Sequence, residues 1–167
     1  CFAKKRLVPQ YVPIDEDHPQ LPEDCYGLSK VVNEQTGQMF HRRTGMQVVS
    51  LRIGNVITPE KYKNFTQFIS DIHARSLILW SYIDARDAAR ACQQAIELDD
   101  LGYVALNLAN NNTSMNIPND QLMKENFPEV TDLRAPLDNY NTLLSNKKAK
   151  EVLKWEPIYN WRDEVTI

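Results

Sequence analysis

One uninterrupted apolar run constrains the fold more than any other part of the sequence. Residues 46–57, MQVVSLRIGNVI, are rich in β-branched side chains and have the length of a strand, and Thr58 and Pro59 end the run. Residues 23–43 precede it with a helical pattern that Gly45 can terminate. A continuous apolar strand directly after a helix is typical of the buried strands of parallel sheets. The sequence therefore predicts an α/β fold.

The rest of the chain continues this alternation. The prolines of residues 7–22 indicate an extended loop, because proline removes a backbone donor and disfavours helix at the residue before it. Further elements are expected in chain order: a weak helix at 62–74, a strand at 77–83, a helix at 84–99, a strand at 103–109, and helices within 116–128 and 145–155, with an asparagine-rich loop at 107–116. Such alternation predicts a parallel sheet.

Composition narrows the classes of partner. With 167 residues, of which 43% are hydrophobic and 25% charged, the chain has the size and composition of one globular domain. A net charge of −3 gives no electrostatic reason to expect nucleic acid or an anionic membrane as a partner, and no apolar run could span a bilayer. The separated cysteines indicate reduced thiols in a cytoplasmic protein, and the scattered histidines argue against a metal site. These residues are Cys1, Cys25, Cys92, His18, His41 and His73.

The stretch PEDCYGLSK, residues 22–30, places Tyr26 and Lys30 four residues apart in the expected helix. Residues at this spacing share one helical face. A phenol loses its proton only near a pH of about 10, so it is a poor base at neutral pH unless a nearby cation stabilises its anion. A lysine ammonium can do so, and such a pair could exchange a proton with an alcohol. The simpler interpretation of the spacing alone is packing plus a solvated charge.

Several patterns surround this pair in a fixed order. A proline-rich loop containing VPIDEDHP precedes the YxxxK helix, LRIGNVITPE follows it, and WSYIDARDAARAC and SNKKAKEVLKWEPIYNWRDEV come later. In this order they resemble the C-terminal portion of the extended short-chain dehydrogenase/reductase family, which includes the NAD-dependent epimerases and dehydratases.

The resemblance implies the C-terminal part of a Rossmann-type doubly wound parallel sheet plus a small α/β substrate-binding lobe. Residues 1–60 would be the C-terminal part of the dinucleotide-binding domain, with the YxxxK helix. Residues 61–167 would form mainly the substrate-binding lobe, with 77–109 contributing a further strand and helix to the sheet.

The resemblance also implies roles for individual residues. Tyr26 would be the general acid/base, and Lys30 would hold the nicotinamide ribose of NAD or NADP and tune the tyrosine. The backbone around Ile53 and Val56 would border the nicotinamide. The substrate would be contacted by Asn55, Trp80 and Arg134, although packing is the alternative for Trp80 and a solvated loop charge is the alternative for Arg134.

The sequence departs from the family's pattern in several places. None of the five glycines forms the glycine-rich turn that receives the pyrophosphate of the cofactor. Residues 1–25 contain no serine or threonine that could be the family's third catalytic group. Trp80 stands about where nucleotide-sugar enzymes commonly carry an arginine, and NVITPE lacks the glycine of the usual NVYGP segment. We therefore expect an N-terminally truncated chain that by itself neither binds NAD tightly nor turns over.

These features predict an NAD(P)-dependent epimerase, dehydratase or dehydrogenase. Its substrate would be a sugar, nucleotide-linked or free, or another secondary alcohol. The family often dimerises through the tyrosine helix, so the resemblance also implies a homodimer. The alternative is a non-catalytic binding or regulatory protein that reuses the same fold.

Overall fold

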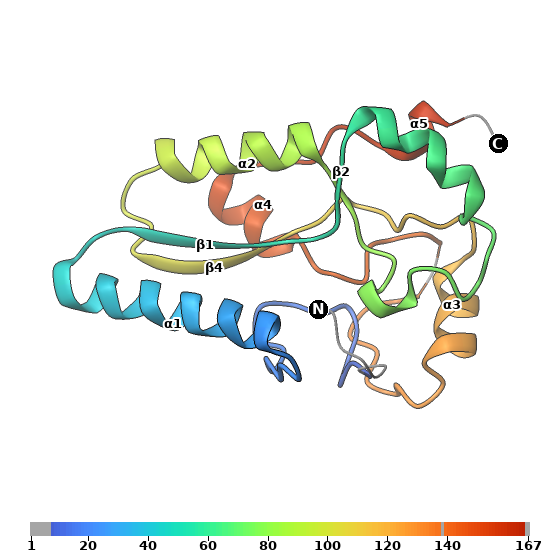
Figure 1. Cartoon of the computed structure of the whole chain (residues 1–167), viewed down its shortest axis with the longest axis horizontal. Coiled ribbons are helices and arrows are strands. Elements are labelled where there is room, and N and C mark those ends of the chain that lie inside the picture. Colours follow the sequence, from blue (N-terminus) through green and yellow to red (C-terminus); the bar gives the residue numbers. More distant parts are fainter. Residues whose placement is uncertain (1–7, 138, 166–167) are drawn as a thin grey trace.

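A parallel ladder of two strands lies at the centre of the computed structural model, which describes residues 8–137 and 139–165 (Figure 1). Strand β1 (Val48–Ile53) pairs in parallel with β4 (Tyr103–Leu108) along its whole length. The register places Val48 opposite Tyr103 and Ile53 opposite Leu108. The α/β fold and the parallel pairing expected from the sequence are thus confirmed.

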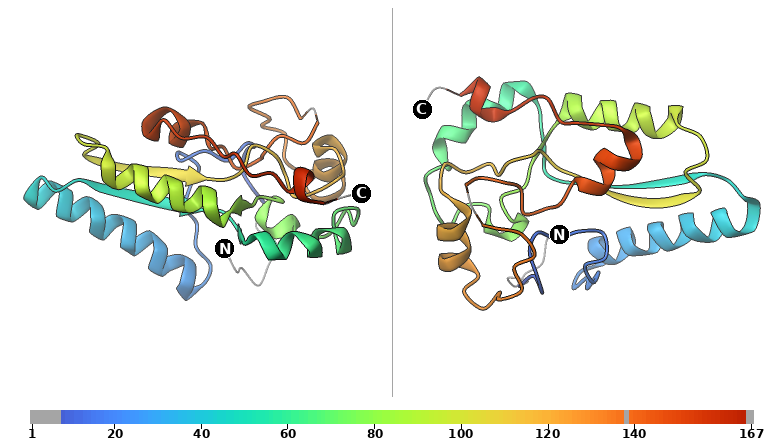
Figure 2. Two further views of the ribbon diagram at one scale, coloured as in Figure 1. Left: turned by 90° about the horizontal axis from the view of Figure 1, so that it is seen from above. Right: turned by 180° about the vertical axis from the view of Figure 1, so that it is seen from behind.

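Helices cover both faces of this ladder (Figure 2). Helix α1 (Cys25–Thr44) contacts both strands, whereas α2 (Ala85–Glu97) and α4 (Lys147–Leu153) lie on the opposite face. The alternation of side chains along β1 separates the two layers: Val48 and Arg52 meet α1, and the odd-numbered residues pack toward α2. The core under α2 and α4 contains Ile83, Ala88, Ala91, Leu106, Leu108, Ala149, Leu153 and Trp155.

Local signals at both ends define α1. The Asp24 carboxylate accepts a hydrogen bond from the backbone N–H of Gly27, and Gly45 ends the helix in the left-handed conformation with φ of 72°. Within the helix, Gly37 allows the backbone to approach β1 closely, because a Cβ there would lie 2.9 Å from a methyl carbon of Val48. The helix expected at 23–43 is therefore confirmed.

A second, shorter parallel pair follows the first. The apolar run 46–57 is interrupted at Gly54 and Asn55, after which β2 (Val56–Ile57) pairs with β3 (Ile83–Asp84). The run is thus divided between two sheets, and β1 itself is only half-buried. The lobe beyond β2 contains two 3-10 helices and two short α-helices: η1 (Pro59–Gln67), η2 (Ser76–Ile78), α3 (Asn119–Asn126) and α5 (Trp161–Glu164).

The lobe contains the largest departures from the sequence expectations. The strand expected at 77–83 is wrong: the chain forms η2, and Leu79 and Trp80 then adopt positive φ values of 49° and 54°, which no strand permits. The helix expected at 62–74 is replaced by η1, which begins earlier at Pro59. The helices and strand expected elsewhere form at 85–97, 103–108, 119–126 and 147–153.

The asparagine-rich stretch is a loop that is largely buried once it leaves β4, although Asn111 is exposed. The Asn110 amide donates to the carbonyl of Tyr159, and the Asn146 amide donates to the carbonyl of Ala109. The Asn119 amide donates to the carbonyl of Asn141 in the same manner. These side chains satisfy backbone carbonyls that an apolar residue would leave unpaired, so the loop can lie inside the lobe.

Two expectations concerned the surroundings of the protein. Within residues 8–137 and 139–165, no helix combines the length and the apolar character that crossing a membrane would require. Cys25 and Cys92 are free thiols, and Cys1 lies outside the described residues.

An ion pair fixes α1 against β1. The Arg52 guanidinium donates from Nε and Nη2 to the two oxygens of Glu34, both at 2.8 Å, and from Nη1 to the carbonyl of Glu16 at 3.0 Å. Both side chains are largely buried, at 24% and 15% exposure. Paired, largely buried charges of this geometry are costly to separate because the remaining partner stays desolvated.

We expect Glu34→Ala to lower the free energy of unfolding by about 1–3 kcal/mol, measured by urea denaturation, because Arg52 would lose its carboxylate partner. The hydrogen bonds from Arg52 hold the pKa of Glu34 below its usual value of 4.5. The contribution should therefore be complete above that pH and disappear as acid protonates Glu34. Glu151→Ala is the control, because Glu151 is exposed and 4.0 Å from Lys147. Equal stability of both variants at pH 7 would contradict the assignment.

Candidate active site

The candidate site lies where the N-terminal end of α1 meets the carboxyl end of β1. The contacts Glu34–Arg52 and Gly37–Val48 show that helix and strand run in opposite directions. Counting from the Glu34–Arg52 pair, Tyr26 lies about 12 Å back along the helix and Val56 about 13 Å forward along the chain. Tyr26 therefore lies at the end of the sheet at which β1 ends. In open parallel sheets, ligands bind beyond this carboxyl edge of the strands.

Tyr26 and Lys30 lie together on α1. The Nζ of Lys30 is 4.9 Å from the centroid of the Tyr26 ring, so the ammonium lies over the ring face. Tyr26 is 52% exposed and is not part of the apolar core. The predicted helical pair is therefore formed, and its phenol is accessible at the surface of the described chain.

Ile53, Asn55 and Val56 form the strand side of the site. Ile53 and Val56 expose 44% and 43% of their surface, and Asn55 is also exposed. The backbone is nevertheless fixed, because the carbonyl of Asn55 accepts the N–H of Ile83 and the N–H of Gly54 donates to Leu108. Exposed apolar side chains on a rigid strand end are suited to contact with a flat ring.

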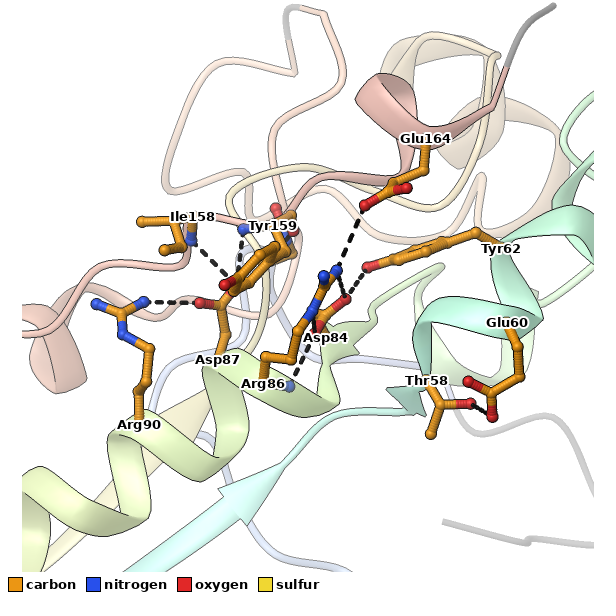
Figure 3. A network of polar contacts seen from close by, with 11 residues as sticks. Thr58, Glu60, Tyr62, Asp84, Arg86, Asp87, Arg90, Ile158, Tyr159 and Glu164 are labelled. Atoms are coloured by element: carbon orange, nitrogen blue, oxygen red, sulfur yellow. Dashed lines mark hydrogen bonds and ion pairs between the residues drawn. The ribbon is translucent and has the colours of Figure 1, made fainter.

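A buried carboxylate ties the lobe to the end of β3 (Figure 3). Asp84 caps α2 through the N–H of Arg86, and it also accepts hydrogen bonds from the Arg86 guanidinium and from the Tyr62 hydroxyl. Arg86 further contacts Glu164 and stacks on the ring of Tyr159. Burial alone would raise the pKa of Asp84, but these hydrogen bonds outweigh it and lower the pKa. The carboxylate is therefore an ionised anchor for η1, which directly follows β2.

Asp87 makes a second anchor one turn further along α2. Its Oδ2 accepts the backbone N–H groups of Ile158 and Tyr159 at 3.0 Å, and its Oδ1 accepts Arg90 at 2.8 Å (Figure 3). The indole of Trp155 donates to the backbone carbonyl of Asp87. These contacts fasten the C-terminal segment across the N-terminal end of α2.

The other two predicted substrate contacts, Trp80 and Arg134, lie in different surroundings. Trp80 has 0% exposure and packs in the lobe core against Phe127, so it offers no surface to a ligand and the packing alternative holds. Arg134 is exposed, lies 3.1 Å from Asp132 and stacks on Tyr11. Burial and a hydrogen bond to Asp15 raise the pKa of Tyr11 to about 12, so this ring stays neutral.

Arg75 is a charged residue that the sequence reasoning missed. Its Nε donates to the Ser114 hydroxyl at 2.8 Å and its Nη2 to the carbonyl of Ser81 at 3.0 Å, and it stacks beside Phe65 and Phe68. Within the described part of the chain it pairs with no carboxylate, and burial lowers its pKa to about 10. A desolvated cation without a counter-ion is costly, which favours a bound anion. The sequence feature that could have drawn attention to Arg75 is its position five residues before Trp80.

Comparison with known proteins identifies the family. The sequence profile of the NAD dependent epimerase/dehydratase family matches residues 6–109. The chain belongs to the NAD-dependent epimerase/dehydratase family. This confirms the family inferred from the order of its sequence patterns.

The known proteins and solved structures that are similar to this chain are longer than it is. It is 28% identical to a UDP-glucose 4-epimerase of Rhizobium leguminosarum bv. trifolii over 92% of this chain and 57% of that protein. It is 29% identical to a uronate dehydrogenase of Pseudomonas syringae pv. tomato over 56% of this chain and 29% of that protein. The UDP-N-acetylglucosamine 4-epimerase structure from Bacillus cereus matches with a TM-score of 0.60 and 21% identity, over 89% of this chain and 56% of that one. The chain thus spans little more than half the length of these epimerases.

For this epimerase/dehydratase chain, we expect Tyr62→Phe to lower the free energy of unfolding by about 1–2 kcal/mol, because buried Asp84 would lose one hydrogen-bond donor. Tyr159→Phe is the matched control, since that residue enters the network through its backbone and ring, which phenylalanine keeps. Thermal and urea denaturation of the three proteins provide the measurement. Equal losses in the two variants would show that Asp84 does not depend on the Tyr62 hydroxyl.

Proposed function

We propose that this chain supplies the proton-transfer and substrate side of an NAD(P)-dependent epimerase, dehydratase or dehydrogenase acting on a sugar. The observation that carries the proposal is the position of an exposed Tyr26, with Lys30 over its ring, level with the carboxyl end of β1. A phenol held beside an ammonium at the ligand-binding edge of a parallel sheet is suited to exchange a proton with a substrate hydroxyl. The family match supports this reading over that of a packed tyrosine.

The residues at the edge fit a nicotinamide. Ile53 and Val56 offer exposed apolar surface to a ring, and Lys30 offers an ammonium to a ribose hydroxyl. The nicotinamide supplies hydride transfer when bound. Backbone N–H groups in a glycine-rich turn would be needed for the pyrophosphate, and the sequence contains no such turn. The proposal therefore covers NAD and NADP alike and places only the nicotinamide end against this chain.

Each residue has one task in the proposed reaction. Tyr26 takes the proton from a sugar hydroxyl as the carbon bearing it is oxidised, and returns a proton when a carbonyl is reduced. Lys30 stabilises the phenolate that accepts the proton and that forms again when the proton is returned. Asn55 presents its amide to the substrate from the rigid end of β1. The reaction thus requires that Tyr26 and the end of β1 keep their relative positions. The Glu34–Arg52 pair holds the helix and the strand together.

An anionic group on the sugar would supply a counter-charge for Arg75 in the lobe. Arg75 is a desolvated guanidinium with no carboxylate partner in the described residues, and a phosphate or carboxylate would supply the missing charge. Arg134 is the second candidate, although it already pairs with Asp132. Proteins similar to this chain act on UDP-sugars and uronates by name, and both are anionic sugars.

The domain boundaries, the homodimer and the cytoplasmic location are also proposals. We propose that residues 1–60 belong to the dinucleotide-binding domain and 61–167 mainly to the substrate lobe. Helix α1 exposes Leu28, Val32 and Met39 at helical spacing, which is the kind of surface that a homodimer would cover. Free thiols at Cys25 and Cys92 favour a cytoplasmic protein.

In a polypeptide that joins this chain to a glycine-rich nucleotide-binding segment, we expect Tyr26→Phe to lower kcat by about 10²–10⁴-fold, because the Tyr26 phenolate is the proton acceptor. Formation of the sugar product is the measurement, and circular dichroism checks that folding is retained. Tyr103→Phe is the control, because Tyr103 lies at the opposite end of β4. Full turnover by Tyr26→Phe would refute the proposed role.

We expect Arg75→Gln to weaken binding of an anionic sugar by about 10–100-fold while a neutral sugar of the same stereochemistry is unaffected, because only the anion pairs with the guanidinium. Calorimetric titration with glucuronate and with glucose is the measurement. Arg43→Gln, on the exposed last turn of α1, is the control. If Arg75→Gln binds both sugars like the parent protein, Arg75 is a structural residue only.

A further inference from the structure

The Arg75 guanidinium is held along one edge. Its Nε donates to the Ser114 hydroxyl at 2.8 Å, and its Nη2 donates to the carbonyl of Ser81 at 3.0 Å. These two nitrogens share one edge of the planar group, whose five N–H donors have a fixed fork geometry. Within residues 8–137 and 139–165, Nη1 donates to no protein acceptor. The edge formed by Nη1 and Nη2 therefore keeps donors for a ligand.

Ser114 fixes the edge that the protein holds. Its side chain is buried, and its hydroxyl donates to the carbonyl of Trp80 at 2.9 Å. The backbone N–H of Ser114 donates to the same carbonyl, also at 2.9 Å. A hydroxyl has one hydrogen, so the side of this oxygen that faces Arg75 is an acceptor. Because Ser81 directly follows Trp80, the two acceptors of Arg75 are fastened to each other.

Helix α5 holds the chain on both sides of Ser114. The indole N–H of Trp161 donates to the backbone carbonyl of Thr113 at 2.9 Å. The Nη2 of Arg162 donates to the backbone carbonyl of Met115 at 2.6 Å. The residues before and after Ser114 are thus bound by two consecutive side chains of α5, which lie about 45 residues further along the chain.

Aromatic rings keep these α5 side chains in place. The central carbon of the Arg162 guanidinium lies 4.1 Å from the centroid of the Tyr140 ring and 4.5 Å from that of Trp161. The ring of Phe65 lies 5.6 Å from the Trp161 ring and 5.9 Å from the central carbon of the Arg75 guanidinium. Arg75 and α5 therefore contact a common ring as well as a common segment of backbone.

We infer that Ser114 is a positioning residue for the anion subsite at Arg75, and that Trp161 and Arg162 hold Ser114 in place. The inference rests on the proposed function, in which Arg75 receives the anionic group of a sugar. Arginine binds a planar anion through its fork, so fixing the fork before binding reduces the entropy that is lost when the anion is bound. Ser114 and α5 then act on the substrate through Arg75.

A role in folding alone is the competing explanation, because the same hydrogen bonds fasten the C-terminal segment to the lobe. The two roles differ in one respect. A purely structural contact affects sugar binding whether or not the Arg75 guanidinium is present, whereas a positioning contact affects anion binding only through that guanidinium. A double-mutant cycle between Ser114 and Arg75 measures this difference.

The first measurement is calorimetric titration with glucuronate and with glucose. Ser114→Ala should weaken glucuronate binding by about 3–10-fold and leave glucose binding unchanged, because Arg75 loses one of its two acceptors. The substitution removes no charge, so the loss cannot come from a missing cation. In the Arg75→Gln background it should cause no further loss. Thr113→Val is the matched control, because the neighbouring buried Thr113 hydroxyl has no hydrogen-bond partner in the described residues.

The second measurement needs no ligand. Hydrogen exchange of the Arg75 Nε–H, followed by NMR, reports whether the guanidinium is held. The exchange should be about tenfold or more faster in Ser114→Ala, where the acceptor is removed, and also faster in Arg162→Gln, where the acceptor is less firmly held. Arg43→Gln, on the exposed last turn of α1, is the control for loss of an arginine and should leave the exchange unchanged.

The outcomes separate this inference from the proposed function. Unchanged glucuronate affinity in Ser114→Ala would overturn the inference, as would an equal loss in the Arg75→Gln background or unchanged Nε–H exchange in both Ser114→Ala and Arg162→Gln. In each case, weaker glucuronate binding by Arg75→Gln would leave the proposed function intact. If the parent protein binds no glucuronate, the proposed anion subsite is wrong and the inference fails with it.

Discussion

The parallel ladder between β1 and β4 is the constraint on which the arrangement depends. Its register fixes where β1 ends, and the Glu34–Arg52 pair fixes α1 against it. Together they bring Tyr26 to the end of the sheet at which β1 ends. A change of one residue in this register would turn Arg52 to the other face of the sheet and release the helix. The candidate chemistry thus depends on an ion pair in the middle of the helix.

Much of this framework could be predicted because its signals are local. Asp24 and Gly45 mark the ends of α1, and Asp84 marks the start of α2, through caps that need no tertiary partner. The lobe was harder, because residues 77–83 have the composition of a strand. Trp80 instead enters the core with a left-handed backbone and packs there against Phe127. Local pattern cannot show such a preference.

The residues of the candidate site also differ in how far local sequence predicts them. The Tyr26–Lys30 pair follows from helical spacing, so the sequence suffices to place the ammonium near the phenol. The energetic cost of burying the Arg75 guanidinium depends instead on its surroundings. Ser81, Ser114 and two phenylalanine rings desolvate it, and within the described chain no carboxylate pairs with it. That combination is assembled from segments about 40 residues apart and has no local signature.

The one disagreement within β1 is informative in physical terms. Its composition predicts a strand buried on both faces and both edges, yet every residue of it keeps some exposure and Ile53 is 44% exposed. Its two faces are covered, by α1 on one side and α2 on the other, so the exposure arises at the edge. Selection for apolar side chains at a solvent-facing edge would carry a risk of aggregation without benefit. Val49 and Leu51 instead pack against the core formed with α2 and α4, which explains their apolar character.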